Sequence, residues 1–185
     1  WQKGEFRIPC IGTVAVEERF SESLSPREVE EVRAYCGMIS LADAQIGRVL
    51  EYLDEAGLAE NTLVFFTADH GDYLGDHFLR SKGALHYEGC TRVPTMARWP
   101  GVIPAGQTCT SLLSNVDLAP TFLSAAGLPV HPEMQGIDQL PVLRDPARKL
   151  REGVLIDFRA EERLYVNSWI TETHRLSVYR TPDGT

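Results

Sequence analysis

The sequence predicts an α/β fold, in which part of a sheet is flanked by helices and followed by a small antiparallel sheet. Three observations predict it: a long amphipathic helix pattern, a run of apolar and β-branched residues at 62–67, and short strand-like runs near the end of the chain. Residues 1–24 mix Gly, Pro, Glu and Ser without periodic apolar positions, and we expect them to be irregular.

A long helix is expected to begin after Ser25. Ser25 can act as the cap, Pro26 suits the first helical position, and Glu28 completes a capping box. Apolar residues then recur at alternating three- and four-residue steps, and Gly57 is a natural end. The members of this stripe are Val29, Val32, Cys36, Ile39, Ile46, Leu50 and Leu53. Asp43 lies on the same stripe, and we expect it to make a buried hydrogen bond rather than to act as an acid.

The apolar run at 62–67 suits a strand that is buried on both faces, as in a parallel sheet covered by helices. Asp69 and His70 follow where this strand should end, and ligands collect at the carboxyl ends of strands in open α/β sheets. A carboxylate and an imidazole are both metal-ligand types, and Gly71 would let the chain turn away. Asp and Gly are also ordinary turn residues, so a plain turn is the alternative.

The chain then continues with a polar loop at 72–89, which is too long for a simple connector. A second strand is expected at 91–99. A short helix is expected at 118–126, with Asp117 as its cap and Gly127 as its end.

The last part of the chain begins with a proline-rich stretch at 129–146, which we interpret as a linker crossing the surface. Short strand-like runs follow and are close enough in sequence to form antiparallel hairpins. They lie at 153–158, 164–170 and 176–180, and a turn is expected at 181–184.

The composition is that of a globular protein, with 43% hydrophobic and 24% charged residues in a chain of 185. The formal net charge of -8 disfavours extended binding to nucleic acid or to an anionic membrane, which requires basic surface. No apolar run approaches the roughly 20 residues of a membrane span.

Residues 35–101 resemble the sulfatase family of the alkaline-phosphatase-like superfamily. The matching pieces lie in one order with short gaps, at 38–50, 61–72, 74–77, 81–83, 87–89, 92–94 and 99–101, with weaker matches at 117–121 and 136–138. The resemblance implies part of an alkaline-phosphatase-like sheet. It also implies a division into residues 1–143, the carboxyl-terminal portion of the catalytic domain, and residues 144–185, the start of a small antiparallel subdomain.

The resemblance also implies a metal site. The family's metal is most often calcium, held by two early acidic residues and by a later Asp with Asn or His; Asp69 and His70 match the later pair. Because calcium prefers oxygen ligands, the imidazole makes magnesium or manganese an alternative. Lys82 matches the lysine that contacts the sulfate and the nucleophile, although a lysine in a polar loop is usually a solvated charge.

Two histidines, His77 and His86, flank Lys82 in the same loop. Either could donate a proton or contact substrate, because an imidazole titrates near neutral pH. The family's usual histidine acid lies upstream of the matching stretch, so the resemblance assigns neither of them. A hydrogen-bonded loop histidine is the simpler interpretation of both.

The family's nucleophile segment, Cys or Ser followed by x-Pro-x-Arg, is absent from these residues, and so is the early acidic pair. We therefore expect the carboxyl-terminal part of a sulfatase, whose full-length parent cleaves small-molecule or saccharide sulfate esters. Alone, this part is expected to be inactive and either to self-associate or to be partly disordered in the loop at 72–89. A phosphonate or phosphate ester hydrolase of the same superfamily is one alternative. A non-catalytic domain that keeps the scaffold and binds a ligand is another.

Overall fold

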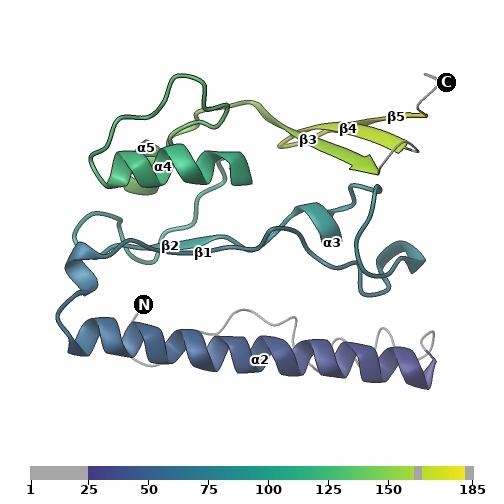
Figure 1. Ribbon diagram of the computed structural model, residues 1–185, viewed down its shortest axis with the longest axis horizontal. Coiled ribbons are helices and arrows are strands. Elements are labelled where there is room, and N and C mark those ends of the chain that lie inside the picture. Colours follow the sequence, from purple (N-terminus) through teal and green to yellow (C-terminus); the bar gives the residue numbers. More distant parts are fainter. Residues whose placement is uncertain (1–24, 161–163, 182–185) are drawn as a thin grey trace. The chain divides into compact units, whose positions relative to one another are not determined.

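The computed structural model describes residues 25–160 and 164–181 (Figure 1). The irregular structure expected for residues 1–24 and most of the turn expected at 181–184 lie outside this part of the chain. The chain divides into two compact units, residues 1–62 and residues 63–185.

The first unit contains α2 (Pro26–Glu55) and the short 3-10 helix η1 (Ala59–Asn61). The predicted capping box is confirmed: the Glu28 N–H donates to Ser25 Oγ, and the Ser25 N–H donates to a Glu28 carboxylate oxygen. Gly57 follows the helix with a φ of 68°, in the left-handed region that glycine tolerates. None of the described helices, α2 included, is both long and apolar enough to cross a bilayer.

The hydrogen bond expected for Asp43 is not found. Oδ1 of Asp43 is enclosed and has no hydrogen-bond partner among the described residues. The side chain lies on α2 in an intermediate environment, and the described residues do not provide the predicted hydrogen bond from a neighbouring loop to this oxygen.

The second unit begins with β1 (Val64–Phe66), which pairs with β2 (Met96–Arg98). Both predicted strands are present, each shorter than the apolar run that predicts it. The expectation of a parallel neighbour and of burial on both faces is wrong for this pair. The two strands are antiparallel, with Phe65 opposite Ala97: the chain after β1 makes a long loop and returns alongside it in the opposite direction. Both strands are half-buried.

Helix α4 (Leu118–Ala125) covers the β1–β2 pair, as Figure 1 shows. Phe122 of α4 meets Phe65 of β1 edge to face, with ring centroids 5.5 Å apart. The helix and its end at Gly127 are confirmed. Asp117 occupies the N-cap position of α4, as predicted, but its side chain makes no capping hydrogen bond there. The Asp117 carboxylate belongs instead to the capping box of the preceding 3-10 helix, η3 (Asn115–Asp117), together with Ser114.

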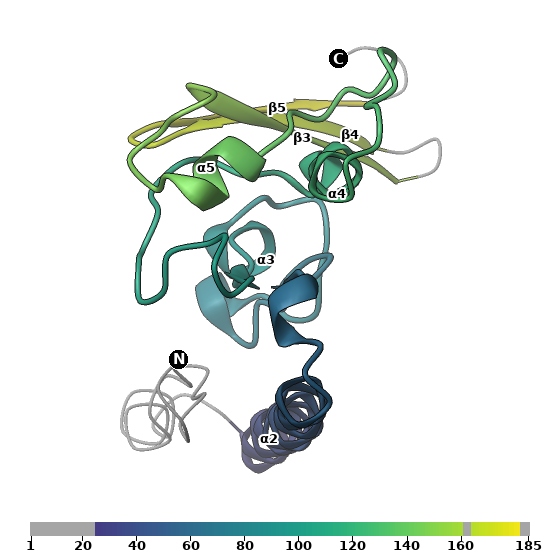
Figure 2. The same cartoon turned by 90° about the vertical axis from the view of Figure 1, so that its left-hand side faces the viewer.

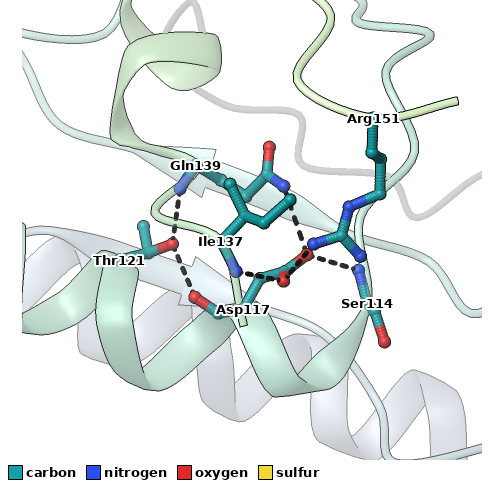
Figure 3. A network of polar contacts seen from close by, with 6 residues as sticks. All are labelled: Ser114, Asp117, Thr121, Ile137, Gln139 and Arg151. Carbon is teal, nitrogen blue, oxygen red and sulfur yellow. Dashed lines mark hydrogen bonds and ion pairs between the residues drawn. The ribbon is translucent and has the colours of Figure 1, made fainter. Parts of the chain in front are cut away.

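Asp117 is fully buried and is the centre of a polar network (Figure 3). One carboxylate oxygen accepts hydrogen bonds from the Ser114 N–H (2.9 Å) and the Gln139 amide (3.2 Å). The other accepts from the Ile137 N–H (2.8 Å) and pairs with the Arg151 guanidinium (2.5 Å). A buried carboxylate is costly unless donors surround it, and these donors come from segments far apart in the sequence.

The prediction of a surface linker at 129–146 is wrong for the second half of this stretch. That half forms α5 (Leu140–Arg144), which lies beside α4, and Leu140 and Val142 are buried. The Gln139 N–H donates to the hydroxyl of Thr121 in α4, so the chain is drawn inward where the linker was expected to cross the surface.

Three strands, β3 (Gly153–Ala160), β4 (Leu164–Thr171) and β5 (Arg175–Arg180), form the predicted antiparallel sheet in the order β3–β4–β5 (Figure 2). Val166 and Ser168 of β4 are fully buried, which marks the face of the sheet that is packed against the rest of the second unit.

Candidate active site

Asp69 and His70 lie just after β1, where the sequence places the end of the strand. The Asp69 side chain is 85% exposed, and that of His70 is 36% exposed. The His70 backbone N–H donates to Asp69 Oδ1 at 2.9 Å. This hydrogen bond, with a smaller contribution from the nearby positive charge of Lys82, holds the pKa of Asp69 below its ordinary value, so Asp69 is an anion at neutral pH.

The His70 ring has one nitrogen bound to the protein backbone. Nδ1 lies 2.9 Å from the Gly71 carbonyl, which can only accept, so Nδ1 carries the proton. Nε2 therefore carries no proton, and its lone pair accepts a hydrogen bond from the Lys82 ammonium at 2.7 Å. The structure thus brings together Asp69, His70 and Lys82, the three residues that the resemblance selects.

The donor set fits a divalent cation. Asp69 Oδ2 and His70 Nε2 lie 3.4 Å apart, but the Nε2 lone pair accepts a hydrogen bond from Lys82, so an ion bound by both atoms would displace the Lys82 ammonium from Nε2. Metal-bound histidines usually donate their second ring N–H to a carbonyl or carboxylate, as Nδ1 does here. Within the described residues, no group of three or more His, Cys, Asp or Glu residues is placed to hold an ion.

Gly71 is required by a close backbone approach. A Cβ at this position would lie 2.0 Å from the Gly89 carbonyl oxygen, and the Gly71 N–H donates to the Cys90 carbonyl at 2.8 Å. Gly71 has no positive φ, so the structural reason differs from the sharp turn expected from sequence. The contact joins the chain after His70 to the end of the 72–89 loop.

Asn115 is a site residue that sequence analysis misses. Its side-chain amide donates to the carbonyl oxygens of Ala68 and Asp69, each at 3.2 Å. Asn115 belongs to η3, whose position the Asp117 network fixes. The only signal in the sequence is that Asn115 lies two residues before a segment, 117–121, that weakly resembles the family.

His77 lies in the same loop as Lys82 but makes other contacts. Its ring stacks on Tyr87, with centroids 3.9 Å apart, and its Nδ1 lies 3.0 Å from Asp76 Oδ1. The side chain is about half exposed (51%). The structure leaves His77 accessible without bonding it to Lys82.

His86 is buried, with 4% of its surface exposed. Nδ1 lies 2.7 Å from the Ser168 hydroxyl of β4, which in turn lies 2.6 Å from the Ser177 hydroxyl of β5. Burial, and secondly the Arg175 guanidinium, lower the pKa of His86. The structure therefore places His86 against the small sheet rather than with Asp69 and His70.

A family model described as Sulfatase matches residues 9–128, which is more than half of the 185 residues. The chain belongs to the sulfatase family, and its α/β fold is of the alkaline-phosphatase-like type. Enzymes of this family depend on a metal ion.

Two relatives illustrate the similarity. The N-acetylglucosamine-6-O-sulfatase of Bacteroides thetaiotaomicron is 39% identical over 117 residues, which cover 63% of this chain and 21% of the relative. A solved structure of BT4656 in complex with its substrate, D-glucosamine-2-N,6-O-disulfate, superimposes with a TM-score of 0.77 at 29% identity. That match covers 89% of this chain and 36% of the solved chain.

The phosphonate monoester hydrolase of Agrobacterium radiobacter is also similar, with a TM-score of 0.63 and 26% identity, over 80% of this chain and 34% of that one. The chain thus spans about a fifth of the curated relative and about a third of these solved chains.

Proposed function

We propose that these residues are part of a metal-dependent sulfuric ester hydrolase, of the arylsulfatase or choline-sulfatase kind. The observation that carries the proposal is the 2.7 Å contact between Lys82 Nζ and His70 Nε2, beside the exposed Asp69 carboxylate. A bound cation and the Lys82 ammonium are both positive, and a sulfate ester is negative. The cluster therefore suits an anionic substrate, although the net charge of the chain is -8.

In this proposal Asp69 and His70 are metal ligands, with calcium the first candidate and magnesium or manganese the alternatives. When bound, such a cation offsets charge on the sulfuryl oxygens, an effect worth several kcal/mol. The Gly71 carbonyl keeps His70 in the tautomer that presents Nε2. When an ion takes His70 Nε2, the Lys82 ammonium leaves that atom and contributes a positive charge that contacts the sulfate group. The proposal assigns the role of nucleophile to no residue of this chain.

The proposed substrate is a small-molecule or saccharide sulfate ester. Support comes from BT4656, whose solved structure holds a glucosamine disulfate, and from the relative that acts as an N-acetylglucosamine-6-O-sulfatase. His77 stays in the proposal as a substrate contact or proton donor because its side chain is accessible. His86 is a weaker candidate for the same role because it is buried.

The proposed domain division separates residues 1–143 from residues 144–185. This boundary lies in the last turn of α5 and precedes β3, and it differs from the division into compact units, which falls between residues 62 and 63. Two further expectations stay predictions: that the chain alone does not hydrolyse sulfate esters, and that it self-associates, which light scattering can check.

A phosphonate or phosphate ester hydrolase is the second candidate function. The observation in its favour is the similarity to the phosphonate monoester hydrolase of Agrobacterium radiobacter. A non-catalytic binding domain is favoured only by the absence of the nucleophile segment from these residues. The identity of the nucleophile that works with Lys82 distinguishes the sulfuric ester hydrolase from the phosphonate or phosphate ester hydrolase. Metal binding by Asp69 and His70 would count against the non-catalytic binding domain.

Titration calorimetry of the 185-residue chain with Ca²⁺, Mg²⁺ and Mn²⁺ tests the metal site. We expect measurable binding of at least one ion, which Asp69→Asn and His70→Ala each abolish. Asp145→Asn is the matched control, because Asp145 is an exposed aspartate that pairs with Arg148. Equal binding by Asp69→Asn and the unmutated chain would contradict the proposal, as would no binding of any of the three ions.

A further inference from the structure

Tyr73 ties together both sides of the loop that carries Lys82. The Tyr73 N–H donates to the Ser81 carbonyl at 2.9 Å. The Tyr73 hydroxyl lies within hydrogen-bond distance of the Gly83 carbonyl, at 3.3 Å, and makes a closer contact with the Leu85 carbonyl. One residue therefore holds alternate carbonyls on either side of Lys82.

The loop requires such support because its backbone is strained. Four residues other than glycine have a positive φ between positions 74 and 81, a conformation that side chains with a Cβ disfavour. They are Leu74 (46°), His77 (52°), Phe78 (61°) and Ser81 (59°). Strained residues persist only where surrounding contacts fix them, and Ser81 directly precedes Lys82.

The Tyr73 side chain is well suited to act as a fixed donor. It is buried, with 4% of its surface exposed, so its position is set by packing. Burial, together with the adjacent Cys90 thiol, raises the pKa of Tyr73 to about 12. The hydroxyl keeps its single proton at neutral pH and donates it to the nearer Leu85 carbonyl, with the Gly83 carbonyl as a second, longer acceptor.

We propose that Tyr73 is a positioning residue: its three contacts with the 81–85 segment hold Lys82 where its ammonium meets His70 Nε2. Tyr73 touches neither the candidate metal ligands nor the lysine side chain through these contacts, so it acts on Lys82 through the backbone. The inference rests on the proposed function only for the importance of Lys82, since the geometry itself can be measured without any substrate.

The test is Tyr73→Phe in the full 185-residue chain, observed by NMR with labelled lysine and histidine. The chain has three lysines, Lys3, Lys82 and Lys149, so the Lys82 signal can be assigned. We expect the nuclear Overhauser contact between the Lys82 side chain and the His70 ring to be lost in the variant. The amide of residue 73, which donates to Ser81, should exchange with solvent roughly tenfold faster, as for one opened hydrogen bond.

Tyr52→Phe is the matched control. Tyr52 lies on α2 with 63% of its surface exposed, so removal of its hydroxyl should leave both signals unchanged. The inference is overturned if Tyr73→Phe keeps the Lys82–His70 contact, or if the unmutated chain lacks that contact.

A second measurement needs no variant and covers the case in which Tyr73→Phe does not fold. In the unmutated chain at low denaturant concentration, exchange of the Tyr73 amide and loss of the Lys82–His70 contact should occur together. Loss of the contact while the amide stays protected would contradict the inference. Both readouts are taken without added metal, so the inference can fail while the Asp69 and His70 site stands, and the reverse.

Discussion

At the scale of single residues, the site is defined by how the His70 ring is held. Its Nδ1 proton is committed to the Gly71 carbonyl, which leaves Nε2 as an acceptor beside Asp69 and Lys82. The tautomer and the ring orientation that a metal-bound histidine needs are therefore fixed before any ligand arrives, and a cation that binds Nε2 would displace the Lys82 ammonium from it.

Gly71 gives a prediction about stability. Gly71→Ala places a methyl group against the Gly89 carbonyl, so the backbone must shift, and we expect a loss of about 2–3 kcal/mol in the free energy of unfolding. Gly47→Ala is the control: nothing lies within 4 Å of its added Cβ, and alanine in a helix should stabilise by about 0.5–1 kcal/mol. Denaturant unfolding measures both, and equal effects would refute the close approach.

His86 gives a prediction about pH. Its pKa is lowered in the folded protein, first by burial and then by Arg175, while Asp157 opposes the shift. Below the ordinary histidine pKa of about 6.5 the unfolded chain binds a proton that the folded chain does not. The free energy of unfolding should therefore fall as the pH drops through about 6.5 and continue to fall down to the pKa of the folded state.

The measurement is the unfolding free energy as a function of pH for His86→Asn, with His131→Asn as the control, since His131 is exposed. We expect His86→Asn to remove part of the acid dependence and His131→Asn to leave it unchanged. An identical pH profile in His86→Asn and the unmutated chain would show that burial does not shift this histidine.

At the scale of elements, the site depends on η3 as well as on β1. Asn115 of η3 bonds the carbonyls of Ala68 and Asp69, so it fixes the backbone that carries the proposed ligands. We expect Asn115→Ala to weaken metal binding about tenfold, the usual effect of losing a residue that orients a ligand. Calorimetry checks this, and Asn61→Ala, an exposed asparagine in η1, should bind metal as the unmutated chain does.

The position of η3 in turn depends on the Asp117 network in Figure 3. Arg151→Met removes the cation from a fully buried carboxylate, which should cost about 3–5 kcal/mol in the free energy of unfolding. Arg148→Ala breaks an exposed pair with Asp145 and should cost less than about 1 kcal/mol. Similar losses in the two variants, measured by denaturant unfolding, would mean that the buried pair does not organise this region.

The elements that sequence analysis predicted correctly are those with local signals. The capping box of α2 lies within four residues, and the hairpins of β3–β5 join runs that are neighbours in sequence. The antiparallel partner of β1 and the contact of Asn115 with Asp69 join residues far apart in the chain. Local patterns carry no information about such contacts, and α5 was missed because its burial depends on Asp117 and Thr121.

At the scale of the whole molecule, the candidate site was predicted from motif order, and the structure supplied its geometry. Asp69, His70 and Lys82 were all selected by resemblance, and the structure adds the Nε2 to Nζ contact and the supporting residues Asn115 and Tyr73. The 185-residue chain matches about a fifth of the N-acetylglucosamine-6-O-sulfatase, so activity must be measured in a protein that also has a nucleophile segment.

The most direct measurement is sulfate release by the N-acetylglucosamine-6-O-sulfatase of Bacteroides thetaiotaomicron in which residues 35–128 of this chain replace the matching segment. We predict that the folded graft releases sulfate in a metal-dependent reaction. Lys82→Ala should slow the reaction by about 10²–10³-fold, as for loss of one charge-stabilising donor, while Arg48→Ala on α2 leaves the rate unchanged. A folded, metal-loaded graft that is inactive, or one that Lys82→Ala does not slow, would contradict the assignment of Asp69, His70 and Lys82 to a sulfuric ester hydrolase site.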